Sequence, residues 1–382
     1  MTSIPFVKKK IGRNYLIWFQ NSNLFFQLEE PAWFIFSRLT KRYRLSTIAG
    51  LFSAQYTVST SESLRFVNEI HAEVLKMNSP FKILQDFLPF TEAINQQRYC
   101  SFSVHHYRLG DQVIKFTFET ALLEFWIHPL ISHFEIIDTG AETTHFELFF
   151  FGEQIAFRYN GEVKGLWKMD ETQYVKGKIF MFLVNAMHQK SDQDWLMTVH
   201  ASAITNGKKT MLFTAEPGKG KTTFASLLQK EGYLLISDDF VPIDRHANNA
   251  YPFPISISVK QGAMELLRTV YPGLEEKVPT RLTPEKVVRY IQPANHAEVI
   301  KAILPVHDIV FIEYNSAIDF KLEPIEPIAA LKTLLEQVWI LPEKANASQF
   351  LDWIFGISFY KLTYSNHTMA LKAIKNLFEH DQ

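Results

Sequence analysis

The amino-acid sequence predicts an α/β fold organised around one phosphate-binding loop, and three observations support this. Met211 to Phe213 is an apolar run typical of a strand, and a Gly-rich turn follows it from Glu216 to Gly220. Apolar residues then recur at helical spacing, at Phe224, Leu227 and Leu228. A strand, a Gly-rich turn and a helix in this order direct backbone N–H groups and the positive end of a helix dipole at one small volume, which suits a polyphosphate.

The loop itself is Glu216-Pro217-Gly218-Lys219-Gly220-Lys221-Thr222-Thr223. In a P-loop the two glycines let the backbone approach the phosphates, the lysine reaches the β- and γ-oxygens, and the first threonine hydroxyl binds Mg²⁺. We therefore expect ATP and Mg²⁺ as cofactors, with Lys221 and Thr222 in these two roles. One position departs from the pattern, because Ala215 stands where the P-loop has a glycine. Either the loop begins with ordinary dihedral angles, or phosphate binding is weakened.

Composition limits the classes of protein. The chain has 382 residues, enough for two or three domains, and its 39 Lys and Arg nearly balance its 40 Asp and Glu. This balance gives no electrostatic reason to expect nucleic acid or a membrane as a partner. The single cysteine, Cys100, fits a reducing compartment, and no apolar run is long enough to span a bilayer. Without an export signal after Lys8–Lys10, we expect a cytoplasmic protein.

The first part, residues 1–80, is predicted to be a small α+β module. A β-hairpin is expected from Tyr15 to Leu28, and three helices follow, over Pro31–Leu39, Leu45–Phe52 and from the N-cap Ser59 onward. This order is similar to that of the PqqD-like family, in Ala32–Leu39, Leu45–Ile48 and Tyr56–Ser59. The resemblance implies a winged-helix module that binds the leader segment of a precursor peptide through a strand edge. The alternative is an ordinary accessory helical domain.

The second part, residues 81–194, is predicted to be a β-rich connecting domain. Apolar and polar residues alternate between Tyr99 and Asn160, and a helix is expected over Lys176–His188. Histidines are frequent in this region, at His105, His106, His128, His133 and His145. Their spacing matches neither a helix-borne nor a zinc-ribbon ligand set, so we do not expect a metal site there.

The third part, residues 195–382, carries the chemistry. Tyr233 to Ile236 is predicted to be a buried parallel strand that ends in Asp238 and Asp239, where α/β sheets place their ligands. A P-loop kinase needs one carboxylate for Mg²⁺ and another to accept the proton of the attacking hydroxyl. Two adjacent residues of an extended segment point to opposite faces, so we expect only one of them to face the phosphates. His200 lies within another predicted strand, from Thr198 to Ile204.

A histidine in a strand, a P-loop and an Asp pair in this order resemble the HPr serine kinase/phosphorylase family, which has the phosphoenolpyruvate-carboxykinase-like P-loop fold. The segments Pro252–Lys260, Val288–Pro293 and Ile309–Tyr314 are also similar, and the resemblance covers about Trp195 to Phe378. It implies ATP-dependent phosphorylation of a hydroxyl. Asp238 is favoured as the base and Asp239 as a metal ligand beside Thr222, and His200 lies near the transferred phosphate or assists the aspartate. Lys260 and Arg289 are candidates to neutralise the charge of the transferred phosphate.

The acceptor is left open by the sequence. Asn295 to Ile303 does not match the Arg- and Gly-bearing substrate loop of true HPr kinases, which puts both HPr as substrate and the reverse phosphorolysis in doubt. We expect a serine of a peptide or protein presented by the N-terminal module. The alternatives are a kinase of a small hydroxyl compound, such as free serine or a sugar, and a nucleotide-binding scaffold without catalysis. The oligomeric state is open. Helices over Pro327–Trp339, Ala345–Phe355 and Thr368–Phe378, with a strand over Phe359–Leu362, should cover the second face of the sheet.

Overall fold

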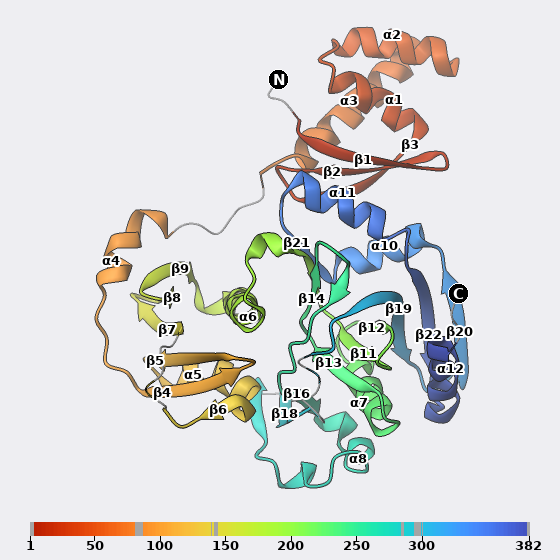
Figure 1. Cartoon of the computed structure of the whole chain (residues 1–382). Helices are drawn as coiled ribbons and strands as arrows, with labels where there is room; N and C mark the ends of the chain where they lie inside the picture. The colour runs from red at the N-terminus through yellow and green to blue at the C-terminus, as the bar shows by residue number, and fades with distance from the viewer. Residues whose placement is uncertain are drawn as a thin grey trace. The chain divides into compact units, whose positions relative to one another are not determined.

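The computed structural model describes residues 4–80, 87–138, 140, 144–283, 286–293, 299 and 301–379 (Figure 1). The chain is mixed α/β with several sheets, as the sequence predicts. It separates into two compact units. Unit 1 comprises Met1–Ile83 and Trp339–Phe355, and unit 2 comprises Leu84–Val338 and Gly356–Gln382. Residues 84–194 and the P-loop region, which the sequence divides at 194, therefore share one unit.

Unit 1 is a three-stranded antiparallel sheet with helices packed on it (Figure 1). Its elements are β1 (Phe6–Ile11), β2 (Asn14–Phe19), β3 (Leu24–Glu29), α1 (Glu30–Leu39), α2 (Leu45–Tyr56), α3 (Thr60–Met77) and α11 (Lys344–Trp353). The predicted hairpin and three helices are confirmed, and Ser59 forms the expected capping box with Glu62. Strand β1 was not predicted. It contains the lysine run, and it pairs along the whole of β2.

Helix α11 lies in unit 1, whereas the sequence assigned Ala345–Phe355 to the C-terminal sheet. The Lys9 ammonium lies 2.7 Å from a carboxylate oxygen of Asp352. The rings of Phe25 and Phe350 pack edge to face, with their centroids 5.3 Å apart. These contacts join segments more than three hundred residues apart, and local periodicity carries no information about them.

The first half of unit 2 contains a six-stranded sheet in the order β6-β4-β5-β7-β8-β9. Its strands are β4 (Ser103–Leu109), β5 (Gln112–Phe118), β6 (Glu135–Ile136), β7 (Thr144–Phe151), β8 (Gln154–Tyr159) and β9 (Glu162–Trp167), and its helices are α4 (Thr91–Gln96), α5 (Ala121–Ile131) and α6 (Thr172–His188). Buried aromatic residues of β5, β7 and β8 form a core with α5 and α6, centred on Phe116, Phe146, Phe157, Ile179 and Leu183. Helix α6 begins four residues before the predicted start.

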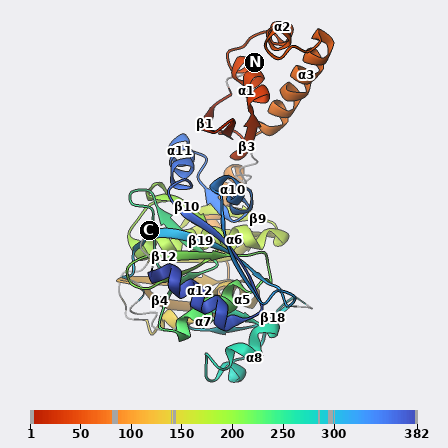
Figure 2. The same cartoon turned by 90° about the vertical axis from the view of Figure 1, so that its right-hand side faces the viewer.

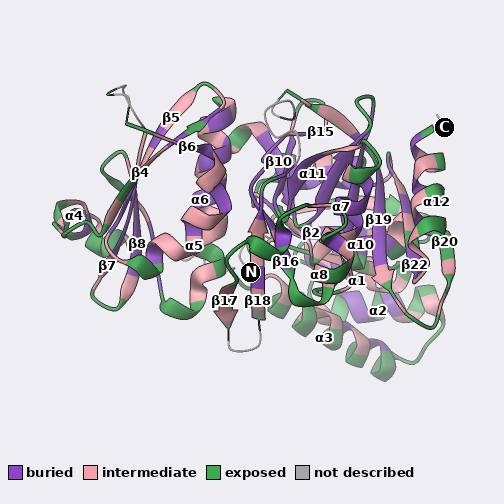
Figure 3. Cartoon of the chain, turned by 90° about the horizontal axis from the view of Figure 1, so that it is seen from below, coloured by how far each residue is buried: buried purple, intermediate pink, exposed green. Residues whose placement is uncertain are grey.

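The second half of unit 2 contains the P-loop sheet, in the order β13-β11-β12-β19-β15-β14-β10, with β22 beside β19 and β20 beside β22. These strands are mostly buried (Figure 3). They are β10 (Trp195–Val199), β11 (Ser202–Thr205), β12 (Thr210–Thr214), β13 (Leu234–Asp238), β14 (Val241–Asp244), β15 (Asn249–Ala250), β19 (Leu304–Tyr314), β20 (Phe320–Ile325) and β22 (Ser358–Tyr364).

The direction of the strands sets the position of the site. Strand β11 is antiparallel to both β12 and β13, so the last two run in the same direction and end at the same edge. Strand β13 is thus hydrogen-bonded to an antiparallel neighbour, rather than directly to a parallel one as predicted. Strands β19 and β22 run parallel to β12 and end at this edge too.

The remaining elements cover these strands. Helix α12 packs against β20 and β22 (Figure 1), and Figure 2 shows the chain from the side on which this helix lies. A smaller sheet in the order β16-β18-β17 completes unit 2. The bounds are α7 (Lys221–Lys230), α8 (Met264–Leu267), α10 (Pro327–Leu335), α12 (His367–Glu379), β16 (Ile257–Lys260), β17 (Thr280–Thr283), β18 (Lys286–Ile291) and β21 (Val338–Ile340). The helix predicted to reach Trp339 ends at Leu335, and β21 follows it. Within the described part of the chain, no helix is both long and apolar enough to cross a membrane.

Candidate functional site

The Gly-rich loop joins the buried strand β12 to helix α7. Gly218 has φ 87° and Gly220 has φ 98°, a left-handed region that side-chain-bearing residues rarely adopt. The amide of Lys219 donates to the Glu216 carbonyl at 3.1 Å, and the amide of Phe224 donates to the Gly220 carbonyl at 2.9 Å, which begins the helix. Ala215 is not among the described residues with positive φ. The chain therefore enters the loop with ordinary dihedral angles, the first of the two expected possibilities.

Lys221, the first residue of α7, lies between two carboxylates. Its side chain is only 9% exposed, its ammonium hydrogen-bonds to Asp239, and it lies 3.7 Å from a carboxylate oxygen of Asp238. Burial alone would lower the pKa of Lys221, but the attraction of Asp239 and Asp238 outweighs it and raises the pKa. The ammonium is therefore charged and directed at the end of β13.

Asp238, the last residue of β13, is buried and hydrogen-bonded. The hydroxyls of Ser202 and Thr222 both donate to its carboxylate, the second at 3.1 Å. Burial and the neighbouring Asp239 raise the pKa of Asp238. Its carboxylate thus lies against the first turn of α7, beside the threonine hydroxyl that a P-loop uses for Mg²⁺.

Asp239 does not point away from Asp238, as an extended pair would. Its φ is 67°, so the strand geometry ends at Asp238 and the next side chain turns back toward the loop. Both carboxylates consequently contact Lys221, and the expectation that they face opposite sides is wrong. Desolvation would raise the pKa of Asp239, but the positive charge of Lys221 outweighs it and lowers this pKa.

His200 lies at the break between β10 and β11, not inside a continuous strand as predicted. Its amide donates to the Gln337 carbonyl at 2.7 Å, which fixes the backbone at this break. Its Nε2 lies 3.8 Å from a carboxylate oxygen of Asp239. Desolvation and the charge of Lys221 lower the pKa of His200, so the imidazole is neutral at pH 7.

A cavity of about 1090 Å³ opens over this cluster, and all residues of the predicted loop except Lys219 line it. Asp239, His200 and Lys260 line it as well, whereas Lys219 lies 3.8 Å from Glu313. Arg289 is not among the lining residues, and its Nε donates instead to the carbonyl of Lys277 at 3.0 Å. Residues 295–298 and 300, the greater part of the segment compared with the HPr-kinase substrate loop, lie outside the described residues.

The same cavity is also lined by residues that the sequence did not indicate as functional, among them Gln173, Glu265, Tyr314, Tyr364 and His367. The two tyrosines are the last residues of β19 and β22, which end at the same edge as β12. The sequence did contain one signal for these two residues, because each is an aromatic residue at the end of an apolar strand. Parallel strands present their carboxyl ends at the same edge of a sheet, which is where ligands bind. The order of the strands in the sheet decides that β19 and β22 end beside the loop, and this order was not evident from the sequence.

No family model and no curated protein matches this chain. Among solved structures, the HPr(Ser) kinase/phosphatase from Coxiella burnetii matches with a TM-score of 0.22 and 16% sequence identity, over 48% of this chain and 95% of that chain. A match at this score and identity does not show that the chain belongs to that family.

Proposed function

We propose that this chain is an ATP-dependent kinase that transfers the γ-phosphoryl group to a hydroxyl. The observation that carries the proposal is the convergence of Lys221, Thr222, Asp238 and Asp239 where the Gly-rich loop meets α7, beside a large cavity. A cation, oxygen ligands for a metal ion and a carboxylate for the hydroxyl proton are what phosphoryl transfer requires.

The donors beside the loop fit Mg²⁺. The Thr222 hydroxyl and an Asp238 carboxylate oxygen lie 3.1 Å apart, and both are the hard oxygen ligands that this ion prefers. Thr222 and Asp238 would hold the ion, which would neutralise the negative charge that develops on the phosphate oxygens. The amides of Gly218, Gly220 and Lys221 would lie beside the phosphates, as at other helix N-termini that bind phosphate, whereas the amide of Lys219 is bonded to the Glu216 carbonyl.

Lys221 has a second role in this proposal. Its ammonium is neutralised by the aspartate pair, which stabilises a buried cation. A bound triphosphate offers it another anionic partner at the loop, and Asp239 is then released from its closest contact. Lys260, which also lines the cavity, would neutralise negative charge on the transferred group.

We favour Asp239 as the proton acceptor, because it lines the cavity with its side chain 46% exposed, whereas Asp238 is buried against Ser202 and Thr222. The acceptor oxygen attacks the γ-phosphorus, its proton passes to Asp239, and the bond from the γ-phosphorus to the bridging oxygen breaks to leave ADP. This exchanges the roles that the sequence assigned to the two residues. His200 would position the Asp239 carboxylate.

Two observations bear on the acceptor. In unit 1, β1 and β3 are the edge strands of the sheet, and an edge can bind an extended peptide, which favours a serine of a peptide or protein. The second candidate is a small hydroxyl compound. The cavity of about 1090 Å³ favours it, because sites for one small ligand commonly have about 300–1000 Å³ and this volume leaves room beside a nucleotide.

The test is ADP release from MgATP by the full chain, with serine-bearing peptides, free serine or sugars as acceptors. Acceptor-stimulated release that falls at least a hundredfold in Asp239→Asn supports the proposal, with Gly262→Ala as a control at the cavity wall. If Asp238→Asn abolishes turnover while Asp239→Asn retains it, the base assignment is wrong. If MgATP binds and no acceptor stimulates release, the scaffold alternative is favoured.

A further inference from the structure

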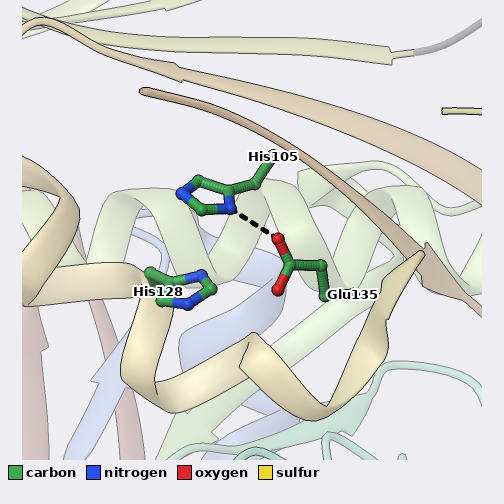
Figure 4. A group of neighbouring side chains, drawn as sticks. All are labelled: His105, His128 and Glu135. Carbon is green, nitrogen blue, oxygen red and sulfur yellow. Dashed lines mark hydrogen bonds and ion pairs between the residues drawn. The ribbon is translucent and has the colours of Figure 1, made fainter. Parts of the chain in front are cut away.

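Away from the loop, three side chains with metal-binding chemistry meet in the first half of unit 2 (Figure 4). They are His105 of β4, His128 of α5 and Glu135 of β6. One ring nitrogen of each histidine and one carboxylate oxygen of the glutamate lie within 4.8 Å of one another. Each comes from a different element, so the group forms only when the sheet and its helix assemble.

Each histidine also has a polar partner outside this group. His105 Nδ1 lies 2.6 Å from Glu135 Oε1, and its other nitrogen, Nε2, lies 2.9 Å from Glu124 Oε1. His128 Nδ1 lies 2.7 Å from the hydroxyl of the buried Tyr107. Histidine ligands of metal ions characteristically use one ring nitrogen for the ion and the other for a carboxylate or similar group that fixes the ring.

We propose that His105, His128 and Glu135 bind a divalent transition-metal ion, with Zn²⁺ as the best match to the donors. Imidazole nitrogen and carboxylate oxygen are the borderline ligands that this ion accepts in sites with three protein ligands. Glu124 orients His105 through Nε2, and Tyr107 orients His128 through Nδ1, which leaves Nε2 of His128 for the ion. A fourth position remains for water or another exchangeable ligand.

The spacing of these ligands along the chain explains why the sequence did not predict a metal site here. His128 and Glu135 flank the end of α5, and His105 lies on a strand before it, so no short motif contains the set. The sequence expectation that these histidines are satisfied by other partners describes the hydrogen bonds correctly. It does not account for two histidines and a carboxylate whose ligand atoms lie within 4.8 Å of one another.

The side chains must rearrange for an ion to bind, because the rings of His105 and His128 are stacked with their centroids 4.3 Å apart, and an imidazole binds an ion in the plane of its ring. Two ligands of one tetrahedral Zn²⁺ ion lie about 3.3 Å apart, whereas His105 Nδ1 and Glu135 Oε1 are separated by 2.6 Å. Glu135 can make this adjustment, because its side chain is 41% exposed and lies at the edge of the sheet. The competing state keeps His105 hydrogen-bonded to both Glu124 and Glu135 without any metal.

The experiment is a calorimetric titration of the metal-free full chain with ZnCl₂, together with the absorption spectrum of the CoCl₂ complex. We expect one equivalent to bind, with visible absorption bands from Co²⁺ in a low-coordinate site. Glu135→Gln should reduce the affinity at least tenfold. His106→Gln is the control, because His106 is the next residue on β4, faces the other side of the strand and lies 3.7 Å from Asp138.

A result that overturns the proposal is a wild-type chain that binds neither ion below 1 mM, or Glu135→Gln and wild type with equal affinity. If Glu135→Gln fails to fold, the Co²⁺ spectrum of the wild-type chain decides. Bands of a low-coordinate site support the proposal, and their absence overturns it. Zn²⁺ should also raise the unfolding temperature of the wild type and not that of Glu135→Gln, because the ion would join β4, α5 and β6.

Discussion

Replacement of Lys221 by methionine should destabilise the folded chain in a pH-dependent way. Lys221 is 9% exposed and Asp238 only 3% exposed, so the variant leaves a carboxylate buried without its cation. Removal of one partner from a buried ion pair typically costs about 3–5 kcal/mol. We expect about 3 kcal/mol at pH 7, at the lower end, because the hydroxyls of Ser202 and Thr222 still donate to Asp238.

The sign of the pH dependence follows from the pKa of Asp238. Burial and Asp239 already raise this pKa, and Lys221 opposes them, so the variant should raise it further. A folded state whose carboxyl pKa is raised binds a proton more readily than the unfolded state does. The destabilisation is therefore largest above the folded-state pKa and shrinks as the pH falls toward the unfolded value of about 3.9.

The assay is urea denaturation of both proteins at pH 7 and pH 5, followed by tryptophan fluorescence. Lys219→Met is the matched control from the same loop, because Lys219 is 41% exposed and lies 3.8 Å from Glu313. An exposed pair of this kind contributes about 0–1 kcal/mol. The reasoning is refuted if Lys221→Met costs no more than Lys219→Met, or if its effect is the same at both pH values.

Two further substitutions test the geometry of unit 2. Gly220→Ala should weaken MgATP binding about 5- to 150-fold in calorimetry, because a φ of 98° costs an alanine about 1–3 kcal/mol. Gly262→Ala is the control. Position 262 has open space around a Cβ and no positive φ, so this variant should bind MgATP normally. Arg158→Met should lower the free energy of unfolding by about 3–5 kcal/mol in urea denaturation, because Arg158 lies 2.5 Å from Glu147 and both side chains are buried. Lys164→Met is the control at an exposed ion pair and should lower the free energy of unfolding by less than about 1 kcal/mol.

The sequence was most informative where local chemistry and periodicity coincide. The loop with Gly218 and Gly220 was predicted with its strand and helix, because positive φ needs glycine and the flanking apolar residues follow strand and helix periods. The placement of Asp238 at the end of a buried strand followed from the short apolar run before it. These features depend on residues within a few positions of one another.

Features that depend on distant contacts were not predictable in this way. The positive φ of Asp239, which turns its carboxylate to Lys221, has no local sequence signal, since the residue is not glycine. Helix α11 joins unit 1 through contacts such as Phe25 with Phe350. The wall formed by Tyr314 and Tyr364 required the strand order, which brings β19 and β22 to the loop.

The most direct test of the account is a calorimetric titration of MgATP into the folded wild-type chain. We predict that one equivalent binds and that the unfolding temperature rises with the MgATP concentration. Binding should be lost in Lys221→Met and retained in Lys219→Met. A folded wild-type chain that shows neither binding heat nor a shift in unfolding temperature at millimolar MgATP would contradict the claim that this loop binds nucleotide.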